Sequence, residues 1–186
     1  EFNLYVKQTY LDNLLRGGYP FTFPKSLKTF YLCSRKHGDP EHDYNKFQIS
    51  PTYLSQGNGN YRDLNQNRRN DIWFNPKVKE ENLYSLINLI QLDGFNPLVV
   101  KGSLFLITNA GRIKEKLLPF CKGDLIDKLL GSFKNKHFSP GELIHFIEDS
   151  HIRLSIGYDQ FLDIFLSFCS RHSEAEHGEG FWIDHW

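Results

Sequence analysis

The sequence predicts a mainly helical domain with an irregular, partly stranded front portion. In the second half of the chain, apolar residues recur at intervals of three and four, which is the spacing of helices that bury one face. Before that, prolines, glycines and polar runs interrupt the apolar period. The 186 residues suit one domain with ample length for a core.

The front portion contains one predicted helix and one predicted strand. Leucines separated by polar residues predict a helix over residues 4–16, and two glycines end it. Two prolines and three aromatic residues within residues 19–24 predict an irregular crossing. Residues 29–33, Thr-Phe-Tyr-Leu-Cys, have strand propensity. Residues 45–53 are expected to be extended.

The second half is expected to be a succession of helices. The spacing i, i+3, i+4, i+7 predicts a first helix around Leu83, Leu86, Ile87 and Ile90. Further helices are predicted over residues 111–119, 124–133, 140–149 and 158–170. Ser139 and Glu142 form an S-x-x-E capping box at the start of the third of these. Periodicity does not assign the short apolar runs at residues 98–100 and 104–107.

Residues 56–71 are the most distinctive stretch of the chain. They read Gln-Gly-Asn-Gly-Asn-Tyr-Arg-Asp-Leu-Asn-Gln-Asn-Arg-Arg-Asn-Asp, too polar for a core strand and without the period of an amphipathic helix. Amides, guanidinium groups and carboxylates each form two directional hydrogen bonds to a hydroxyl-rich or phosphate-bearing ligand. Gly57 and Gly59 let the backbone turn tightly and approach such a ligand. The stretch is therefore a candidate binding loop.

A solvated polar loop is the alternative reading of the same residues. Phosphate prefers pairs of arginines, which makes Arg68 and Arg69 candidates for a phosphate site, but surface salt bridges would also explain them. The flanking residues favour a site, because we expect apolar side chains to anchor the loop at both ends. These anchors are Tyr53, Leu54, Ile72, Trp73 and Phe74.

Residues 172–186 form a second candidate cluster. In an extended segment, Trp182, Asp184 and Trp186 share one face, with a carboxylate between two indoles. Such a face suits a pyranose, whose C–H groups stack on the rings while its hydroxyls bond the acid. A core aromatic patch with a helix-capping Asp is the alternative. A metal site is a weaker one, because the spacing matches no zinc pattern, and its ligands would be His172, His177, His185, Glu179 and Asp184.

Composition narrows the function classes. Basic and acidic residues balance at 22 each, so no net field favours nucleic acid or an acidic membrane. A nucleic-acid binder using Arg62, Arg68 and Arg69 is therefore a weak alternative.

The chain has no apolar run long enough to span a membrane, and its 3 dispersed cysteines favour a reducing, cytoplasmic location. The absence of P-loop, Rossmann, G-x-S-x-G and C-x-x-C motifs leads us to expect no cofactor. Methionine is absent, even at position 1, and we expect an internal piece of a longer polypeptide.

Residues 61–67, Tyr-Arg-Asp-Leu-Asn-Gln-Asn, resemble the Y/F-R-D-S-N-Q-D motif of the inverting β-glucoside phosphorylases, the cellobiose and chitobiose phosphorylases. Residues 53–76 and 34–39 are more similar still to the large cellobiose phosphorylase-like group that includes the β-1,3-glucan phosphorylases. The resemblance spans most of the chain. It implies that residues 1–186 are part of one catalytic domain, an α/α toroid of the six-hairpin barrel type. The implied reaction is reversible, inverting phosphorolysis of β-glucosidic bonds to glucose-1-phosphate.

Matching positions give the implied roles of the first cluster. Arg62 and Asp63 stand where the family holds the donor sugar in the cleavage subsite. Asn65, Gln66 and Asn67 complete the substrate-binding motif, although Asn67 replaces the Asp of the disaccharide phosphorylases.

The second cluster matches the family less closely. Residues 180–184, Gly-Phe-Trp-Ile-Asp, partly match the general-acid motif G-x-x-W-N-D-x-M but lack its Asn and Met. They fit better the upstream S-D-D-H-L-W segment that lines the site, which implies substrate contacts for Trp182, Asp184 and His185. The general acid is then expected beyond Trp186, with Asp184 as the other candidate.

The resemblance also implies partners and a mechanism. The partners are a β-linked gluco-oligosaccharide, inorganic phosphate as co-substrate and the rest of the parent chain, while a homodimer stays open. One acid suffices because phosphate is itself the nucleophile, so no base is needed to activate water. The alternative from another class is a non-catalytic sugar-binding or scaffolding module.

Overall fold

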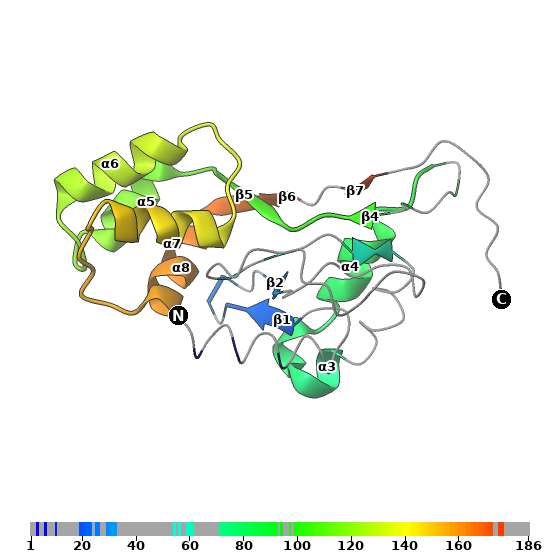
Figure 1. The fold of residues 1–186 in the computed structure, drawn as a ribbon. Helices are drawn as coiled ribbons and strands as arrows, with labels where there is room; N and C mark the ends of the chain where they lie inside the picture. Colours follow the sequence, from blue (N-terminus) through cyan, green and yellow to red (C-terminus); the bar gives the residue numbers. More distant parts are fainter. Residues whose placement is uncertain are drawn as a thin grey trace.

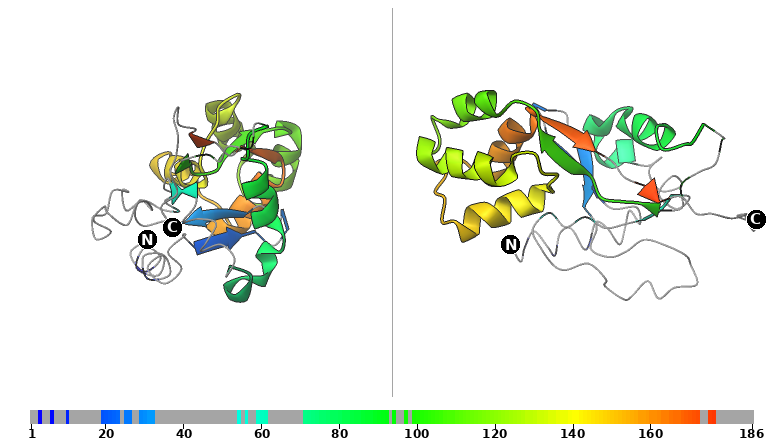
Figure 2. Two further views of the ribbon diagram at one scale, coloured as in Figure 1. Left: turned by 90° about the vertical axis from the view of Figure 1, so that its right-hand side faces the viewer. Right: turned by 90° about the horizontal axis from the view of Figure 1, so that it is seen from above.

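The computed structural model describes residues 3, 6, 10, 19–23, 25–26, 29–32, 54, 56, 59–61, 71–92, 94, 97, 99–172 and 175–176. Helix is the prevalent regular structure among them and the strands are short, so the predicted mainly α class is confirmed. Helices α5 to α8 lie together at one end of the molecule, and α3, α4, β1 and β2 lie at the other (Figure 1). Strands β5 and β6 lie between helices α5 to α8 and helix α4, and the view from above in Figure 2 shows the same order.

The helical end confirms the helices predicted from apolar periodicity. They are α5 (Ala110–Leu117), α6 (Gly123–Phe133), α7 (Pro140–Asp149) and α8 (Tyr158–Leu166). The capping box of α7 is also confirmed, because Ser139 Oγ accepts from Glu142 N and Glu142 Oε2 accepts from Ser139 N. None of the helices among the described residues combines the length and apolarity needed to cross a membrane.

Helix α8 is shorter than predicted. We expected helix over residues 158–170, but α8 ends at Leu166 and strand β6 (Cys169–His172) follows. Strand β6 pairs antiparallel with β5 (Leu104–Ile107), in the register Leu104↔His172 to Ile107↔Cys169. A strand partner more than 60 residues earlier along the chain thus overrides the local helical pattern.

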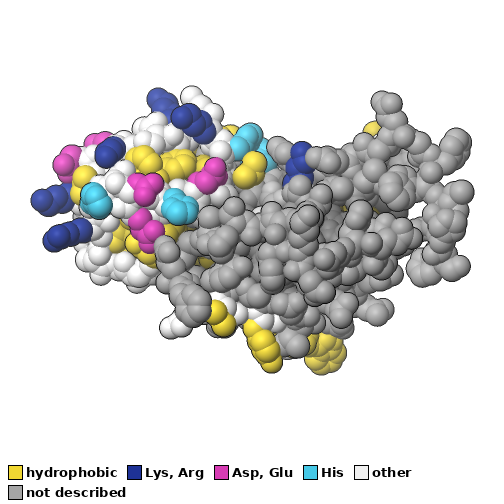
Figure 3. Space-filling model, viewed as in Figure 1, with side chains coloured by type: hydrophobic (Ala, Val, Ile, Leu, Met, Phe, Trp, Pro, Cys, Tyr) yellow, Lys and Arg dark blue, Asp and Glu magenta, His cyan; other side chains and the backbone are white. Residues whose placement is uncertain are grey.

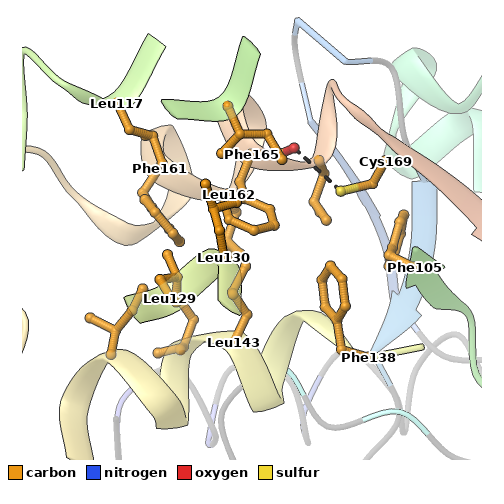
Figure 4. Packing of buried hydrophobic residues seen from close by; sticks show 14 of the residues in the cluster. Phe105, Leu117, Leu129, Leu130, Phe138, Leu143, Phe161, Leu162, Phe165 and Cys169 are labelled. Carbon is orange, nitrogen blue, oxygen red and sulfur yellow. Dashed lines mark hydrogen bonds between the residues drawn. The ribbon is translucent and has the colours of Figure 1, made fainter. Parts of the chain in front are cut away.

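The core fills the space between these four helices and β5. Its largest fully buried side chains include Phe105, Leu117, Phe138, Phe161 and Phe165, seen in Figure 4. The rings of Phe138 and Phe165 meet edge to face with centroids 5.9 Å apart. Each such side chain contributes about 1.5–3 kcal/mol on burial, so this cluster stabilises the helical end.

A β-hairpin, with strands β1 (Tyr19–Thr22) and β2 (Thr29–Leu32), occupies part of the front portion. Strand β2 was predicted, but the irregular crossing expected for residues 19–24 was wrong. Pro20 is tolerated because β1 is an edge strand that pairs with β2 alone among the described residues. Phe30 of β2 lies 6.4 Å from Phe105, centroid to centroid, and joins the hairpin to the core.

Three short helices follow the polar stretch: α3 (Asp71–Phe74), the 3-10 helix η1 (Pro76–Val78) and α4 (Glu81–Ile87). The helix predicted around Leu83 is confirmed, although it ends before Ile90. Its apolar face is not buried as the spacing suggested, since Ile87 is 61% exposed and Leu83 is equally accessible. In Figure 3, hydrophobic side chains lie at the surface around α3, whereas charged side chains surround α5 to α8.

The two unassigned apolar runs are strands. Residues 104–107 form β5, and residues 98–100 contain β4 (Val99–Val100). Strand β4 lies between β3 (Gly59–Asn60) and β7 (Ala175–Glu176) in a three-stranded sheet. Composition did not predict β3, because its two residues belong to the polar stretch.

Candidate functional site

The predicted site residues lie outside the described residues. They are Arg62, Asp63, Asn65, Gln66, Asn67, Arg68, Arg69, Trp182, Asp184 and His185. The structure does describe β3 and β7, which lie within the two clusters, and the residues at the two ends of residues 62–70. We call these described residues the framework of the candidate site, because they hold the chain on either side of the predicted site residues.

The sheet β3–β4–β7 brings the starts of the two clusters close together. Strands β3 and β7 both run antiparallel to β4, so they run parallel to each other on its two sides. Asn60, the last residue of β3, pairs with Val99, and so does Glu176, the last residue of β7. With strands spaced about 4.8 Å apart, Asn60 and Glu176 lie about 10 Å from each other. Residues 61–71 and 177–186, which hold the predicted site residues, therefore follow two strands that finish at the same end of one small sheet.

Tyr61 anchors the first cluster directly before its motif. Its side chain is only 6% exposed, and its hydroxyl donates to the backbone oxygen of Leu86 at 2.9 Å. A buried phenol that satisfies its hydroxyl through a backbone carbonyl is held in one position. Tyr61 thereby ties the start of residues 62–70 to α4.

Asp71 anchors the other end of the same segment. It is 1% exposed, and Asn82 donates its side-chain amide to Asp71 Oδ2 at 2.9 Å. The apolar anchors predicted at this end are wrong, because Trp73 is 82% exposed and Ile72 and Phe74 are also accessible. Helix α3 is a single turn, so only part of it faces the body, and Asp71 takes that place.

The anchor predicted before the loop is partly confirmed. Leu54 is buried in the core cluster, whereas Tyr53 lies outside the described residues. The sequence does not reveal Tyr61 and Asp71 as anchors, because nothing local distinguishes the Asp71 carboxylate from the other polar groups of the run and Tyr61 stands between Asn60 and Arg62. The available signal was the single aromatic residue in an otherwise polar run.

Arg171 of β6 links the parts of the framework. Its guanidinium donates to Thr29 O at 2.9 Å and to Ser85 Oγ at 2.8 Å, and it forms an ion pair with Glu81. One side chain thus joins β2, α4 and β6. Since α4 also receives the Tyr61 hydroxyl, the anchor of the first cluster and Arg171, which directly precedes the second cluster, both bind α4.

His172 is the one member of the proposed metal set that the structure describes. Its ring meets that of His137 edge to face at 4.5 Å, and its Nε2 lies 3.2 Å from Ser170 Oγ. Across the described ranges, no three His, Cys, Asp or Glu side chains gather where a metal ion could bind. The other four candidates lie outside those ranges.

Burial raises the pKa of the Cys121 thiol, but this residue lies between α5 and α6 at the helical end. Comparison with protein-family models, with curated proteins and with solved structures finds no significant match to the chain.

Proposed function

We propose that this chain is part of the catalytic domain of a carbohydrate phosphorylase. The enzyme would catalyse reversible, inverting phosphorolysis of β-glucosidic bonds and yield glucose-1-phosphate. The observation that carries the proposal is that β3 and β7 end on the two sides of Val99, at the same end of one sheet, shortly before residues 61–67 and 180–185, which carry the resemblance to phosphorylases. A site built from two distant segments needs such a meeting point, and a pair of unrelated surface loops does not.

The α/α toroid is the architecture that we propose for the complete domain. In support, α5 contacts both α6 and α8, and these helices bury apolar faces against one another. Helical hairpins of this kind are the repeating unit of a toroid. The three-stranded sheet and the β1–β2 hairpin would then lie at the margin of the helical layer.

In the proposed mechanism, Arg62 and Asp63 hold the donor glucose by charge-assisted hydrogen bonds. Arg68 and Arg69 supply paired donors to inorganic phosphate. A carboxylic acid protonates the departing glycosidic oxygen while a phosphate oxygen attacks the opposite face of the anomeric carbon. The C–O bond to the leaving sugar breaks as the C–O bond to phosphate forms, so a β-linkage yields the α-phosphate. No base and no cofactor is required, and a cytoplasmic location would supply the phosphate.

A phosphorolysis assay tests the proposal. The complete polypeptide that contains this chain is incubated with inorganic phosphate and a panel of β-linked gluco-oligosaccharides, and glucose-1-phosphate is measured. We expect α-glucose-1-phosphate, identified by its anomeric NMR coupling, from at least one substrate. If calorimetry shows that an oligosaccharide binds but no glucose-1-phosphate is formed, the enzyme proposal fails. The chain would then be a non-catalytic sugar-binding module.

A further inference from the structure

We propose that Gln56 is a positioning residue that fixes the register of β3 against β4, and so the place from which the Arg62–Asp63 pair starts. The activity part of this inference rests on the proposed function, whereas the register part does not. Gln56 lies ahead of β3, outside the motif of residues 61–67.

The side chain of Gln56 pairs with both backbone groups of one residue. Its Oε1 accepts from Ser103 N at 2.8 Å, and its Nε2 donates to Ser103 O at 3.0 Å. A primary amide has the same donor and acceptor pair as a peptide group. Gln56 therefore offers Ser103 the two hydrogen bonds that a neighbouring strand residue would exchange with it.

The position of this contact follows the register of the sheet. Gly59 pairs with Val100 and Asn60 pairs with Val99, in antiparallel order. The same register continued by three residues places Gln56 opposite Ser103. The side chain thus extends the β3–β4 ladder beyond its two backbone pairs, at the correct step.

Gly102 makes the close approach of Gln56 feasible. A Cβ atom at position 102 would lie 2.9 Å from Gln56 Cβ, a separation that real side chains do not adopt. The absence of a side chain at 102 lets the amide reach Ser103. The contact therefore depends on both segments: the amide of Gln56 before β3 and the missing side chain of Gly102 after β4.

A two-residue strand needs contacts that fix its register on both sides: Tyr61 is held after β3, and Gln56 is held before it. Register is weakly specified in short, polar or Gly-rich strands, and β3 is Gly59–Asn60. A slip of one residue would move the chain by about 3.3 Å at Tyr61. Misplacement of a binding group by about 1 Å can cost a hundredfold in rate, so the slip would disable the donor subsite.

The test compares Gln56→Ala with Asn109→Ala in the complete polypeptide. Asn109 Oδ1 accepts from Arg112 N at the start of α5, so its removal also deletes a side-chain bond to the backbone, but away from the sheet. Hydrogen exchange resolved to single residues should accelerate at Ser103 in Gln56→Ala only. The amide of Phe105, bonded to Phe138 O, serves as the internal control.

We expect kcat/KM for phosphorolysis to fall roughly thirtyfold in Gln56→Ala and to stay near wild type in Asn109→Ala.

The variant Gln56→Glu tests the hydrogen bonds themselves, because the pH dependence of its activity would not change through general destabilisation of the fold. The ionised carboxylate still accepts from Ser103 N but faces Ser103 O without a proton to donate. Protonation restores the donor, so activity relative to wild type should recover as the pH falls below about 6. This variant keeps the shape of glutamine and also covers the case in which Gln56→Ala does not fold.

The outcomes separate the register role from the proposed function. If the wild type is active and Gln56→Ala matches it, the positioning role is overturned and the phosphorylase stands. If the wild type has no phosphorolytic activity, the proposed function fails. Hydrogen exchange then decides the register alone: acceleration at residues 59–60 as well as at Ser103 supports it, and acceleration at Ser103 alone, or unchanged exchange, overturns it.

Discussion

The Asp163 carboxylate of α8 accepts the backbone N–H of Lys25, 138 residues earlier in the chain, with both of its oxygens at 3.0 and 3.1 Å. Asp163 Oδ1 also accepts from Ser26 N at 2.8 Å. The side chain is buried, so a helix residue supplies the acceptors for the turn between β1 and β2. This contact joins the front portion to the helical end.

Replacement of Asp163 by Ala should lower the free energy of unfolding by about 3 kcal/mol. The loss comes from charge-assisted hydrogen bonds and from two backbone N–H groups left without their acceptor. Asp127→Ala is the matched control, because Asp127 forms an exposed ion pair with Lys114 at 2.6 Å and its loss should cost less than about 1 kcal/mol. Urea unfolding measures both. Equal losses would mean that the turn does not depend on Asp163.

Leu162→Ala should lower the free energy of unfolding by about 2–5 kcal/mol, because it opens a cavity among fully buried side chains. Leu118→Ala removes the same atoms from a residue that is 51% exposed and should cost less than about 1 kcal/mol. Thermal unfolding followed by calorimetry gives the difference. A small effect of Leu162→Ala would contradict the packing of α8 against the core.

Ser139→Ala should cost about 1 kcal/mol, since it removes the acceptor for Glu142 N in the capping box of α7. Ser132→Ala is its control: the Ser132 hydroxyl bonds Lys128 O on an exposed helix face, and we expect a change within about 0.5 kcal/mol. Chemical denaturation of the two variants makes the comparison. The capping role fails if Ser139→Ala is as stable as Ser132→Ala.

Asp63→Asn in the complete polypeptide should lower kcat/KM for phosphorolysis by about a hundredfold or more while the fold stays intact. The change removes the charge of an Arg–Asp pair proposed to hold the donor sugar, and such contacts strengthen in the transition state. Steady-state kinetics with circular dichroism as the folding check provides the measurement. Asp127→Asn, on the surface of α6, should retain wild-type kinetics. Near-wild-type phosphorolysis by Asp63→Asn would remove Asp63 from the proposed donor subsite.

The residue types of the candidate site could be predicted from the sequence, but the strands that bring its parts together could not. The sequence marked residues 56–71 and 172–186 as polar and aromatic clusters, and the structure adds that β3 and β7 bring their starts to the two sides of Val99. No periodicity in either cluster contains this information, because β4 lies about 40 residues after one and more than 70 residues before the other. The same holds for Gln56, whose amide type was evident but whose partner, Ser103, was not.

The sequence by itself determined the helices whose signals are local. Helices α5, α6 and α7 follow from apolar spacing, and the start of α7 follows from the chemistry of Ser139 and Glu142, because hydrogen bonds within a helix join residues four apart. Only the tertiary structure decided where α8 ends, which face of α4 is left exposed and how β1 accommodates Pro20. Each of these depends on a partner far away in the chain, and strand pairing and burial are set by that partner.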